Sequence, residues 1–167
     1  TECTIYYTND VHSYVTGSTF TYAYLKTLKD STENSLLVDA GDEIQGNIYG
    51  TFDKGESIIK LMNATGYDLA TLGNHEFDYG IPELEKRISE AKFDYVSCNF
   101  VTTKSGKKEN VLKPYKIFEV NGLKIAFVGI STPYTVTSST PKYFMNENNE
   151  FIYDFDGREN VNDLYAS

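Results

Sequence analysis

Strand-like and helix-like segments alternate through the first hundred residues of this chain, and this alternation most limits the fold it can adopt. Four short runs are rich in β-branched, aromatic or continuous apolar residues, and the segments between them carry apolar residues at helical spacing. The strand-like runs span residues 4–8, 35–40, 68–72 and 95–98. The helical segments span residues 22–30, 58–66 and 82–91. Strand alternating with helix predicts a layered α/β fold with a largely parallel sheet.

A hairpin signal follows the alternating part. Residues 115–120 and 123–130 flank the pair Asn121-Gly122, which favours a type I′ turn between antiparallel strands. Residues 132–149 are polar and rich in Ser, Thr and Asn, which predicts a loop. No linker divides the 167 residues, so we expect one domain with parallel strands and alternating helices, followed by an antiparallel hairpin.

The charge of the chain excludes one class of function. A formal net charge of -9 argues against a general nucleic-acid binder, because such a protein needs a basic face. The same charge would not attract a phosphorylated substrate, so bound dications would have to supply the local positive field. No apolar run approaches the roughly 20 residues that span a membrane.

The two cysteines are expected to be free, buried thiols. Cys3 opens the first strand-like run and Cys98 closes the fourth, so in a parallel sheet about five residues of ~3.3 Å each would separate their levels. A disulfide requires Cα atoms within ~7 Å of each other. The chain starts at Thr1 without a signal peptide, which we interpret as a mature or trimmed start, and residues 163–167 read as a helix that is cut.

Three polar motifs close three of the strand-like runs. They read Asp10-Val11-His12, Gly41-Asp42 with Gly46, and Gly73-Asn74-His75-Glu76-Phe77-Asp78. Ligands of open α/β sheets bind beyond the carboxyl ends of the strands, so we expect these motifs to meet at one edge. Taken singly, each of the first two is more often explained by ordinary cap or turn residues than by a metal site. The occurrence of all three in order favours a functional site.

The residue types in these motifs suit a pair of divalent cations. Asp10 and His12 are two residues apart and would point to the same side of an extended backbone. Asp42 could bridge two cations, and Asn74 offers a neutral oxygen to the second. Mixed nitrogen and oxygen ligands favour Zn or Mn, with Fe, Mg, Ca and Co as further candidates. Two such cations ~3.5–4 Å apart would generate hydroxide at neutral pH and clamp phosphoryl oxygens.

His75 and Asp78 form a second constellation. A carboxylate three residues after a histidine can hold its tautomer, leaving the other ring nitrogen to stabilise phosphoryl charge or protonate a leaving alcohol. We therefore expect His75 and Asp78 to be catalytic, with Asn74 and His75 also contacting substrate. Asn99 ends a strand at the same edge and could contact substrate as well. Glu76 could contact the residues that support the site, but its position favours a first-turn helix charge.

These strings resemble the calcineurin-like metallophosphoesterase superfamily. More narrowly, they resemble the secreted 5′-nucleotidase family, which includes UDP-sugar hydrolases and 2′,3′-cyclic-nucleotide phosphodiesterases. The matching strings lie at residues 8–12, 39–46 and 72–80, with looser echoes as far as about Phe144. The resemblance implies that Asp10 and His12 bind a first metal, Asp42 bridges, Asn74 binds a second metal, and Asp78 orients a catalytic His75.

The resemblance also implies a function and a location. Such enzymes hydrolyse nucleotide phosphomonoesters with metal-activated hydroxide, in extracellular, periplasmic or cell-surface locations. Family members carry a further histidine, a Gly-x-His-x-His segment and a C-terminal nucleotide-specificity domain, whereas nothing after His75 is histidine here. Residues 1–167 are therefore expected to be the N-terminal portion of a metallophosphoesterase domain, with the specificity domain absent.

A second hypothesis follows from the incomplete ligand set. The chain alone could be a non-catalytic fragment with a half-formed metal site, acting only as a folding or interaction module. An α/β sheet that lacks its later strands exposes an edge and an apolar face. We therefore also expect the isolated chain to self-associate.

Overall fold

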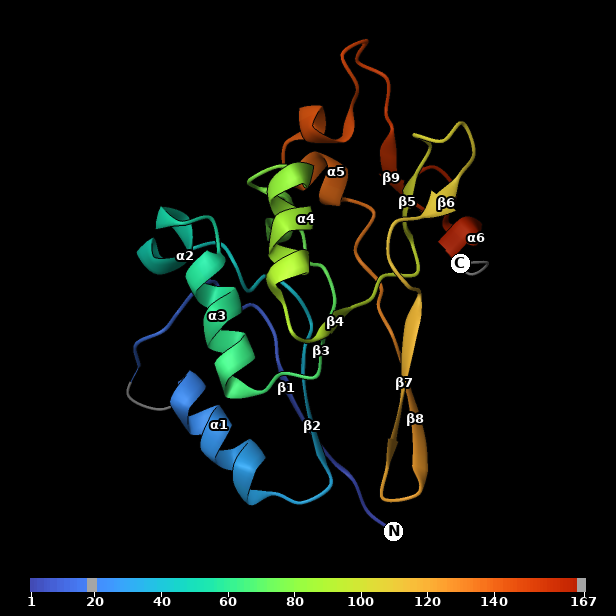
Figure 1. Cartoon of the computed structure of the whole chain (residues 1–167). Coiled ribbons are helices and arrows are strands. Elements are labelled where there is room, and N and C mark those ends of the chain that lie inside the picture. The colour runs from blue at the N-terminus through green and yellow to red at the C-terminus, as the bar shows by residue number, and fades with distance from the viewer. Residues whose placement is uncertain (18–20, 165–167) are drawn as a thin grey trace.

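Four parallel strands form the central sheet of the computed structural model, which describes residues 1–17 and 21–164 (Figure 1). Their order is β1-β2-β3-β4, with parallel pairing throughout. The strands are β1 (Thr4–Thr8), β2 (Ser35–Asp39), β3 (Leu69–Ala70) and β4 (Asp94–Tyr95). The helices that connect them are α1 (Tyr22–Ser31), α3 (Glu56–Thr65) and α4 (Ile81–Glu90). All three helices lie on one side of the sheet in Figure 1, so the layered α/β prediction is confirmed.

Local sequence signals account for the helix ends. The side chain of Thr21 accepts a hydrogen bond from the backbone N–H of Tyr24 and so caps α1. Gly66, at φ +91°, ends α3, and the backbone N–H groups of Gly66 and Tyr67 both bond to the carbonyl of Met62. Pro82 occupies the first turn of α4, where its missing N–H costs no helical hydrogen bond.

The predicted hairpin is present and lies on the other side of the sheet from the helices in Figure 1. Strands β7 (Tyr115–Val120) and β8 (Leu123–Val128) pair antiparallel through a two-residue turn. Both turn residues, Asn121 and Gly122, have positive φ, which is the type I′ pattern. The hairpin is held at both ends: Lys116 forms a 2.6 Å ion pair with Asp94, and Nδ2 of Asn121 in the turn donates to the carbonyl of Glu2 at 3.0 Å.

A third group of short elements was not predicted. Strand β5 (Phe100–Thr102) pairs antiparallel with β6 (Glu109–Asn110) and with β9 (Tyr153–Phe155). The loop predicted at 132–149 is wrong in part, because it contains α5 and the single turn η2. The remaining bounds are α2 (Ile48–Phe52), η1 (His75–Phe77), α5 (Thr135–Ser138), η2 (Pro141–Phe144) and α6 (Val161–Leu164). Such short elements depend on packing, which sequence periodicity does not report.

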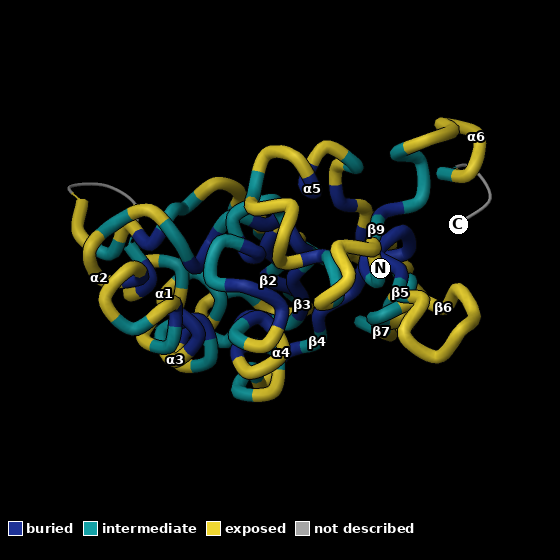
Figure 2. Tube along the Cα trace, turned by 90° about the horizontal axis from the view of Figure 1, so that it is seen from above, coloured by how far each residue is buried: buried dark blue, intermediate teal, exposed yellow. Residues whose placement is uncertain are grey.

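Buried residues lie between the sheet and its helices and continue under β5 and β9, while exposed residues lie at the periphery (Figure 2). Phe77, fully buried, has its ring centroid 5.1 to 5.5 Å from those of Phe100, Phe144 and Phe155. This aromatic cluster fixes the turn that carries His75.

The two cysteines are free thiols, as the sequence predicts. Cys98 is buried, whereas Cys3 is half-buried rather than buried.

The longest helices in the described part of the chain have ten residues, and none is long and apolar enough to cross a membrane. The predicted cut helix at 163–167 extends into residues 165–167, which lie outside the described residues.

Candidate metal centre

The three strands that precede the polar motifs end at one level of the sheet. Thr8 at the end of β1 pairs with Asp39 at the end of β2, which pairs with Ala70 at the end of β3. The segments that follow therefore leave the same edge of the sheet. This is the edge at which open α/β sheets bind ligands.

The first two motifs stay together because backbone pairing continues past the strands. The N–H of Asp10 donates to the carbonyl of Gly41 at 3.1 Å, and the N–H of His12 donates to the carbonyl of Asp42 at 2.9 Å. The N–H of Ser13 bonds in the same way to Glu43. These bonds hold the backbone of the first motif beside that of the second before any side chain is considered.

The second and third motifs touch through two glycines. A Cβ atom on Gly41 would lie 2.4 Å from the backbone nitrogen of Gly73, and one on Gly73 would lie 2.3 Å from Oδ1 of Asp42. Gly41 also has φ +103°, a conformation that side chains disfavour. Only glycine permits this approach, which brings the turn after β2 against the turn after β3.

Positive φ angles concentrate in the same loops. Among the described residues, eight non-glycine residues have positive φ, and four of them are Asp10, His12, Ser13 and Asp42. Each such residue costs on the order of 1–3 kcal/mol and persists only where surrounding contacts enforce it. The strain therefore marks these two loops as candidates for function.

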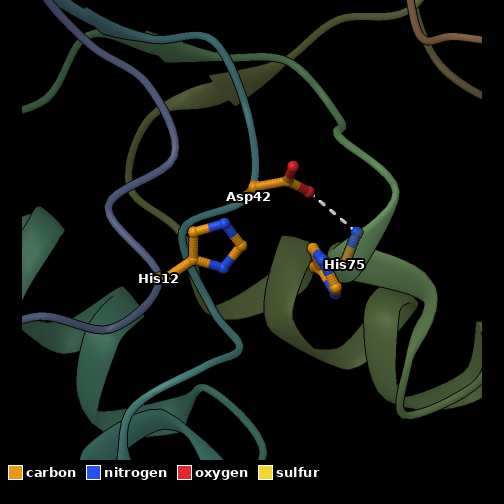
Figure 3. A group of neighbouring side chains, drawn as sticks. All are labelled: His12, Asp42 and His75. Atoms are coloured by element: carbon orange, nitrogen blue, oxygen red, sulfur yellow. Dashed lines mark hydrogen bonds between the residues drawn. The ribbon is translucent and has the colours of Figure 1, made fainter.

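Side chains from the three motifs converge on one place (Figure 3). One ligand atom from each of His12, Asp42 and His75 lies within 4.8 Å of the other two. The two imidazole rings meet edge to face, with centroids 5.0 Å apart. Oδ1 of Asp42 accepts a hydrogen bond of 2.8 Å from the backbone N–H of His75. Residues far apart in sequence thus form a compact group of nitrogen and oxygen donors.

The ring of His12 is oriented by its neighbours. Its Nδ1 lies 3.1 Å from the carbonyl oxygen of Gln45, which can only accept, so Nδ1 carries the proton. In the neutral ring this leaves the lone pair of Nε2 facing Oδ1 of Asp10 at 3.5 Å. Two acceptors that face each other at this distance are suited to share a cation. Asp10 itself is exposed at the margin of the group.

His75 is paired as the sequence predicts. Its Nδ1 lies 2.6 Å from Oδ2 of Asp78, and Oδ1 of Asp78 accepts a 3.1 Å hydrogen bond from the hydroxyl of Ser139. Burial lowers the pKa of His75, but the hydrogen bond and charge of Asp78, with two further carboxylates, outweigh it and raise the pKa above its ordinary value. The ring is thus held in one orientation with Nε2 free to act on a ligand. Ser139 is a contact that the sequence did not reveal, because it lies 61 residues after Asp78.

The two asparagines named from the sequence lie in different settings. Asn74 is half-buried and directly precedes His75 at the start of η1. Asn99 is fully buried, and its amide is engaged by the backbone of Ser131 on both its oxygen and its nitrogen. Its Nδ2 also bonds to the carbonyl of Asp156. The amide oxygen and nitrogen of Asn99 are thus both occupied by backbone groups, which leaves neither for a substrate.

Glu76 differs most from its sequence interpretation. It is not an exposed first-turn charge, because its side chain is buried and it accepts hydrogen bonds from the turns after β2 and β3. Burial raises the pKa of Glu76, although the N–H of Asp42 opposes this. The sequence places Glu76 in the third motif, but that position does not distinguish a charge at a helix start from a buried hydrogen-bond acceptor.

Two more acids lie buried beneath the site. Asp39 is buried and accepts the N–H of Gly41 at 2.8 Å and the hydroxyl of Thr8. Burial raises the pKa of Asp39 to about 7. Glu43 is fully buried, accepts the hydroxyl of Tyr95 at 2.5 Å, and has its pKa raised by burial and by neighbouring carboxylates.

Comparison with known proteins now identifies the group to which this site belongs. A family model described as calcineurin-like phosphoesterase matches residues 3–162. The chain belongs to the calcineurin-like phosphoesterase family. Its homologues include 5′-nucleotidases, as the three motifs predicted.

Individual relatives agree with this assignment. The chain is 36% identical over 159 residues to the NAD 5′-nucleotidase of Haemophilus influenzae and 33% identical over 169 residues to a snake venom 5′-nucleotidase of Gloydius brevicauda. These matches cover 84% and 89% of this chain but only 26% and 29% of the relatives' lengths. The crystal structure of the calcineurin-like phosphoesterase YfkN from Bacillus subtilis matches with a TM-score of 0.74 and 28% identity, over 98% of this chain and 58% of that one.

Membership of the calcineurin-like phosphoesterase family implies metal ions, and the residues of this chain fit them. The convergent donors are imidazole nitrogens and a carboxylate oxygen, a set that suits Zn, Mn or Fe. Nε2 of His12 lies 3.5 Å from the carboxylate of Asp10, so a cation bound there would have a nitrogen and an oxygen donor side by side. The half-buried setting of all three convergent residues is that of an accessible site rather than a closed structural one.

Proposed function

We propose that this chain forms part of a metal-dependent phosphoesterase that hydrolyses phosphomonoesters of nucleotides. The observation that carries the proposal is the convergence of His12, Asp42 and His75 beyond the strand ends, with His75 paired to Asp78. The names of two relatives supply the substrate class, since the proteins from Gloydius brevicauda and Haemophilus influenzae are both called 5′-nucleotidases. Residues 1–167 would be the N-terminal portion of the catalytic domain, and a nucleotide-specificity domain would lie outside this chain.

Four residues are proposed to hold two divalent metals, Zn or Mn. Asp10 and His12 would hold the first, Asn74 the second, and Asp42 would contact both. Bound metals supply positive charge that offsets the negative charge of a phosphate ester and lower the pKa of water. The chain's own contribution is to hold the donors in place through the paired loops and the contact between Gly41 and Gly73.

His75 is proposed to act directly on the substrate. Asp78 accepts a hydrogen bond from Nδ1–H, so in the protonated ring the proton on Nε2 would be available to a phosphoryl oxygen or to the departing oxygen of the alcohol. The raised pKa of His75 favours the protonated ring that this role requires. Asp78 would act by orienting the ring and stabilising its charge, and Ser139 would hold Asp78.

A second candidate function follows from the number of histidines. The sequence contains two, and both already lie in the convergent group. Further imidazole ligands would have to come from outside this chain. On its own the chain would then bind metal weakly and turn nothing over, acting as a folding or interaction module.

The proposed location is outside the cytoplasm, either free or at a cell surface. Its support is the relative from snake venom, a secreted fluid. The acidic charge of the chain gives no independent reason to favour either setting.

Metal binding by this chain is the direct test. Isothermal titration with Zn²⁺ and with Mn²⁺ should show binding that weakens by at least about tenfold in Asp42→Asn, since the amide keeps its shape but loses the charge. Asp30→Asn, at an exposed position on α1, is the matched control and should bind as wild type does. Equal affinity in wild type and Asp42→Asn would contradict the proposed site.

Hydrolysis of AMP separates the two candidate functions. Robust turnover by this chain with two tightly bound metals would exclude the non-catalytic alternative. In a longer protein that contains this domain, His75→Ala should lower kcat by about 10²- to 10⁴-fold, the usual contribution of an acid–base group. An unchanged kcat would remove His75 from the catalytic role.

A further inference from the structure

A single buried carboxylate joins the two turns that carry most of the site. The side chain of Glu76 accepts four backbone N–H groups. Its Oε2 accepts from Gly73 at 2.7 Å and from Asp42 at 2.8 Å, while Oε1 accepts from Glu43 at 2.9 Å and Ile44 at 3.4 Å. Glu76 is 1% exposed, so these bonds lie away from water.

The donors come from two separate segments. Gly73 belongs to the turn after β3, whereas Asp42, Glu43 and Ile44 form the turn after β2, 32 to 34 residues before Glu76. Oε2 is shared between the two turns, so it fixes the distance between them. A carboxyl oxygen has two lone pairs, so Oε2 can accept both donors at once.

A charge at a helix start does not explain this arrangement. Glu76 lies in the three-residue turn η1, and three of the four N–H groups it accepts belong to another part of the chain. The bonds instead lie around Asp42, whose carboxylate belongs to the convergent group with His12 and His75. The N–H of Asp42 donates to Glu76, and Oδ1 of Asp42 accepts from the N–H of His75, the residue immediately before Glu76.

We propose that Glu76 is the positioning residue of this site: its carboxylate clamps the Asp42 turn to the Gly73 turn and thereby sets the place of the Asp42 carboxylate relative to His75. Glu76 contacts neither substrate nor the reacting atoms and acts through backbone amides. The consequence for metal affinity rests on the proposed function, whereas the clamp itself can be tested without metal.

Glu76→Gln is the sharpest variant. It keeps the shape of the side chain but replaces one accepting oxygen by an N–H₂ group, which cannot accept the backbone donors now bound there. In the metal-free chain, amide exchange at Asp42, Glu43 and Gly73 should become faster than in wild type, while exchange in β1 and α3 is unchanged. In a titration with Zn²⁺, affinity should fall about 10- to 100-fold, as for other partners of ligand residues.

The matched control is Glu33→Gln, which makes the same chemical change at an exposed residue before β2, at the end of that strand away from Asp42. It should alter neither amide exchange nor zinc affinity. Faster exchange with unchanged zinc affinity would overturn the positioning role, because the clamp would then be merely structural. Unchanged exchange at the three amides would overturn the clamp itself.

Failure of the proposed function has a different signature. If the wild-type chain binds no Zn²⁺, the metal-site proposal fails, but faster exchange in Glu76→Gln still supports the clamp. If Glu76→Gln does not fold, amide exchange in the wild-type chain tests the clamp instead. The amides of Asp42, Glu43 and Gly73 should then exchange far more slowly than those of the exposed loop at residues 104–107, and equally fast exchange would overturn the proposal.

Discussion

Oδ1 of Asp42 accepts a hydrogen bond from the backbone N–H of His75 at 2.8 Å, although 33 residues separate the two in sequence. The bond joins the second polar motif to the third without any cation. It also leaves the second carboxylate oxygen of Asp42 free of this contact. The donor group is therefore organised by the protein itself, so changes in the supporting contacts should be measurable in the metal-free chain.

Replacing Gly73 by alanine should disturb this relationship. The new methyl would lie 2.3 Å from Oδ1 of Asp42 and 2.8 Å from its backbone nitrogen, so the two turns must separate. We expect a loss of about 1–3 kcal/mol, typical of overpacking, in urea unfolding. The NMR signals of both histidine rings should also shift.

Gly106→Ala is the control for this change. A Cβ atom there meets nothing within 4 Å, and only the positive φ of +80° disfavours it. It should cost about 1–2 kcal/mol from backbone strain but leave the histidine signals in place. Identical histidine spectra for wild type and Gly73→Ala would show that the turns are not held as closely as described.

Removing the ring of Phe77 should destabilise the whole domain. Phe77 is fully buried among three other phenylalanine rings, so Phe77→Ala leaves a cavity and should cost about 3–5 kcal/mol. Chemical denaturation followed by circular dichroism measures this directly. Phe52→Ala removes the same ring where it is 90% exposed and should change stability by less than about 0.5 kcal/mol. Similar losses in both variants would contradict the aromatic cluster.

The metal-free chain should lose stability as pH rises from about 4 to about 7. Burial raises the pKa of Asp39 to about 7, partly opposed by hydrogen bonds from Thr8 and Gly41 and supported by the charge of Glu76. A carboxyl whose folded pKa exceeds its unfolded value binds protons more tightly in the folded state. Its stabilising contribution is therefore complete below the unfolded pKa and is lost as pH passes through the folded one.

Thermal melts at several pH values test this dependence. Asp39→Asn keeps the shape and can still accept the N–H of Gly41, but it cannot ionise, so the profile should flatten. It should not become flat, because burial also raises the pKa of Glu43 and Glu76. Glu33→Gln, at an exposed carboxyl, should leave the slope unchanged. A wild-type melting temperature that rises between pH 5 and pH 7 would contradict the sign.

Self-association of the isolated chain, expected from the sequence, now has a specific surface to test. Strand β1 lies at an edge of the parallel sheet, and one face of the β7–β8 hairpin exposes Tyr115, Ile117 and Val128, each to about half or more of its surface. Sedimentation velocity at increasing concentration should show dimers or larger species. The double variant Ile117→Lys, Val128→Lys should shift the chain towards monomer, because charge disfavours burial of that face.

Phe52→Lys is the comparison for this effect. It introduces the same charge at another exposed apolar side chain, on α2, away from the hairpin. It should leave association as in wild type. A wild-type chain that stays monomeric at all concentrations would show the expectation to be wrong.

Local chemistry made much of the fold predictable. Gly66 ends a helix because it adopts a left-handed conformation. Pro82 fits the first turn of a helix because the N–H it lacks has no helical partner there. Asn121-Gly122 turns a hairpin because both residues accept positive φ. Each of these effects acts within a few residues. The short strand β5, the turn η2 and strand β9 were missed because they depend on packing between distant residues: Phe100, Phe144 and Phe155 pack on Phe77.

The candidate site was likewise predictable where it depends on local sequence and unpredictable where it depends on contacts between distant residues. The sequence alone determined which donors follow which strands, and hence that Asp10, His12, Asp42, Asn74 and His75 leave one edge of the sheet. Only the tertiary structure decided that Glu76 clamps two turns and that Asn99 is enclosed. The reason is physical: a strand's direction is set by its own residues, whereas the partner of a buried polar group is chosen by whichever distant backbone the fold brings within hydrogen-bond reach.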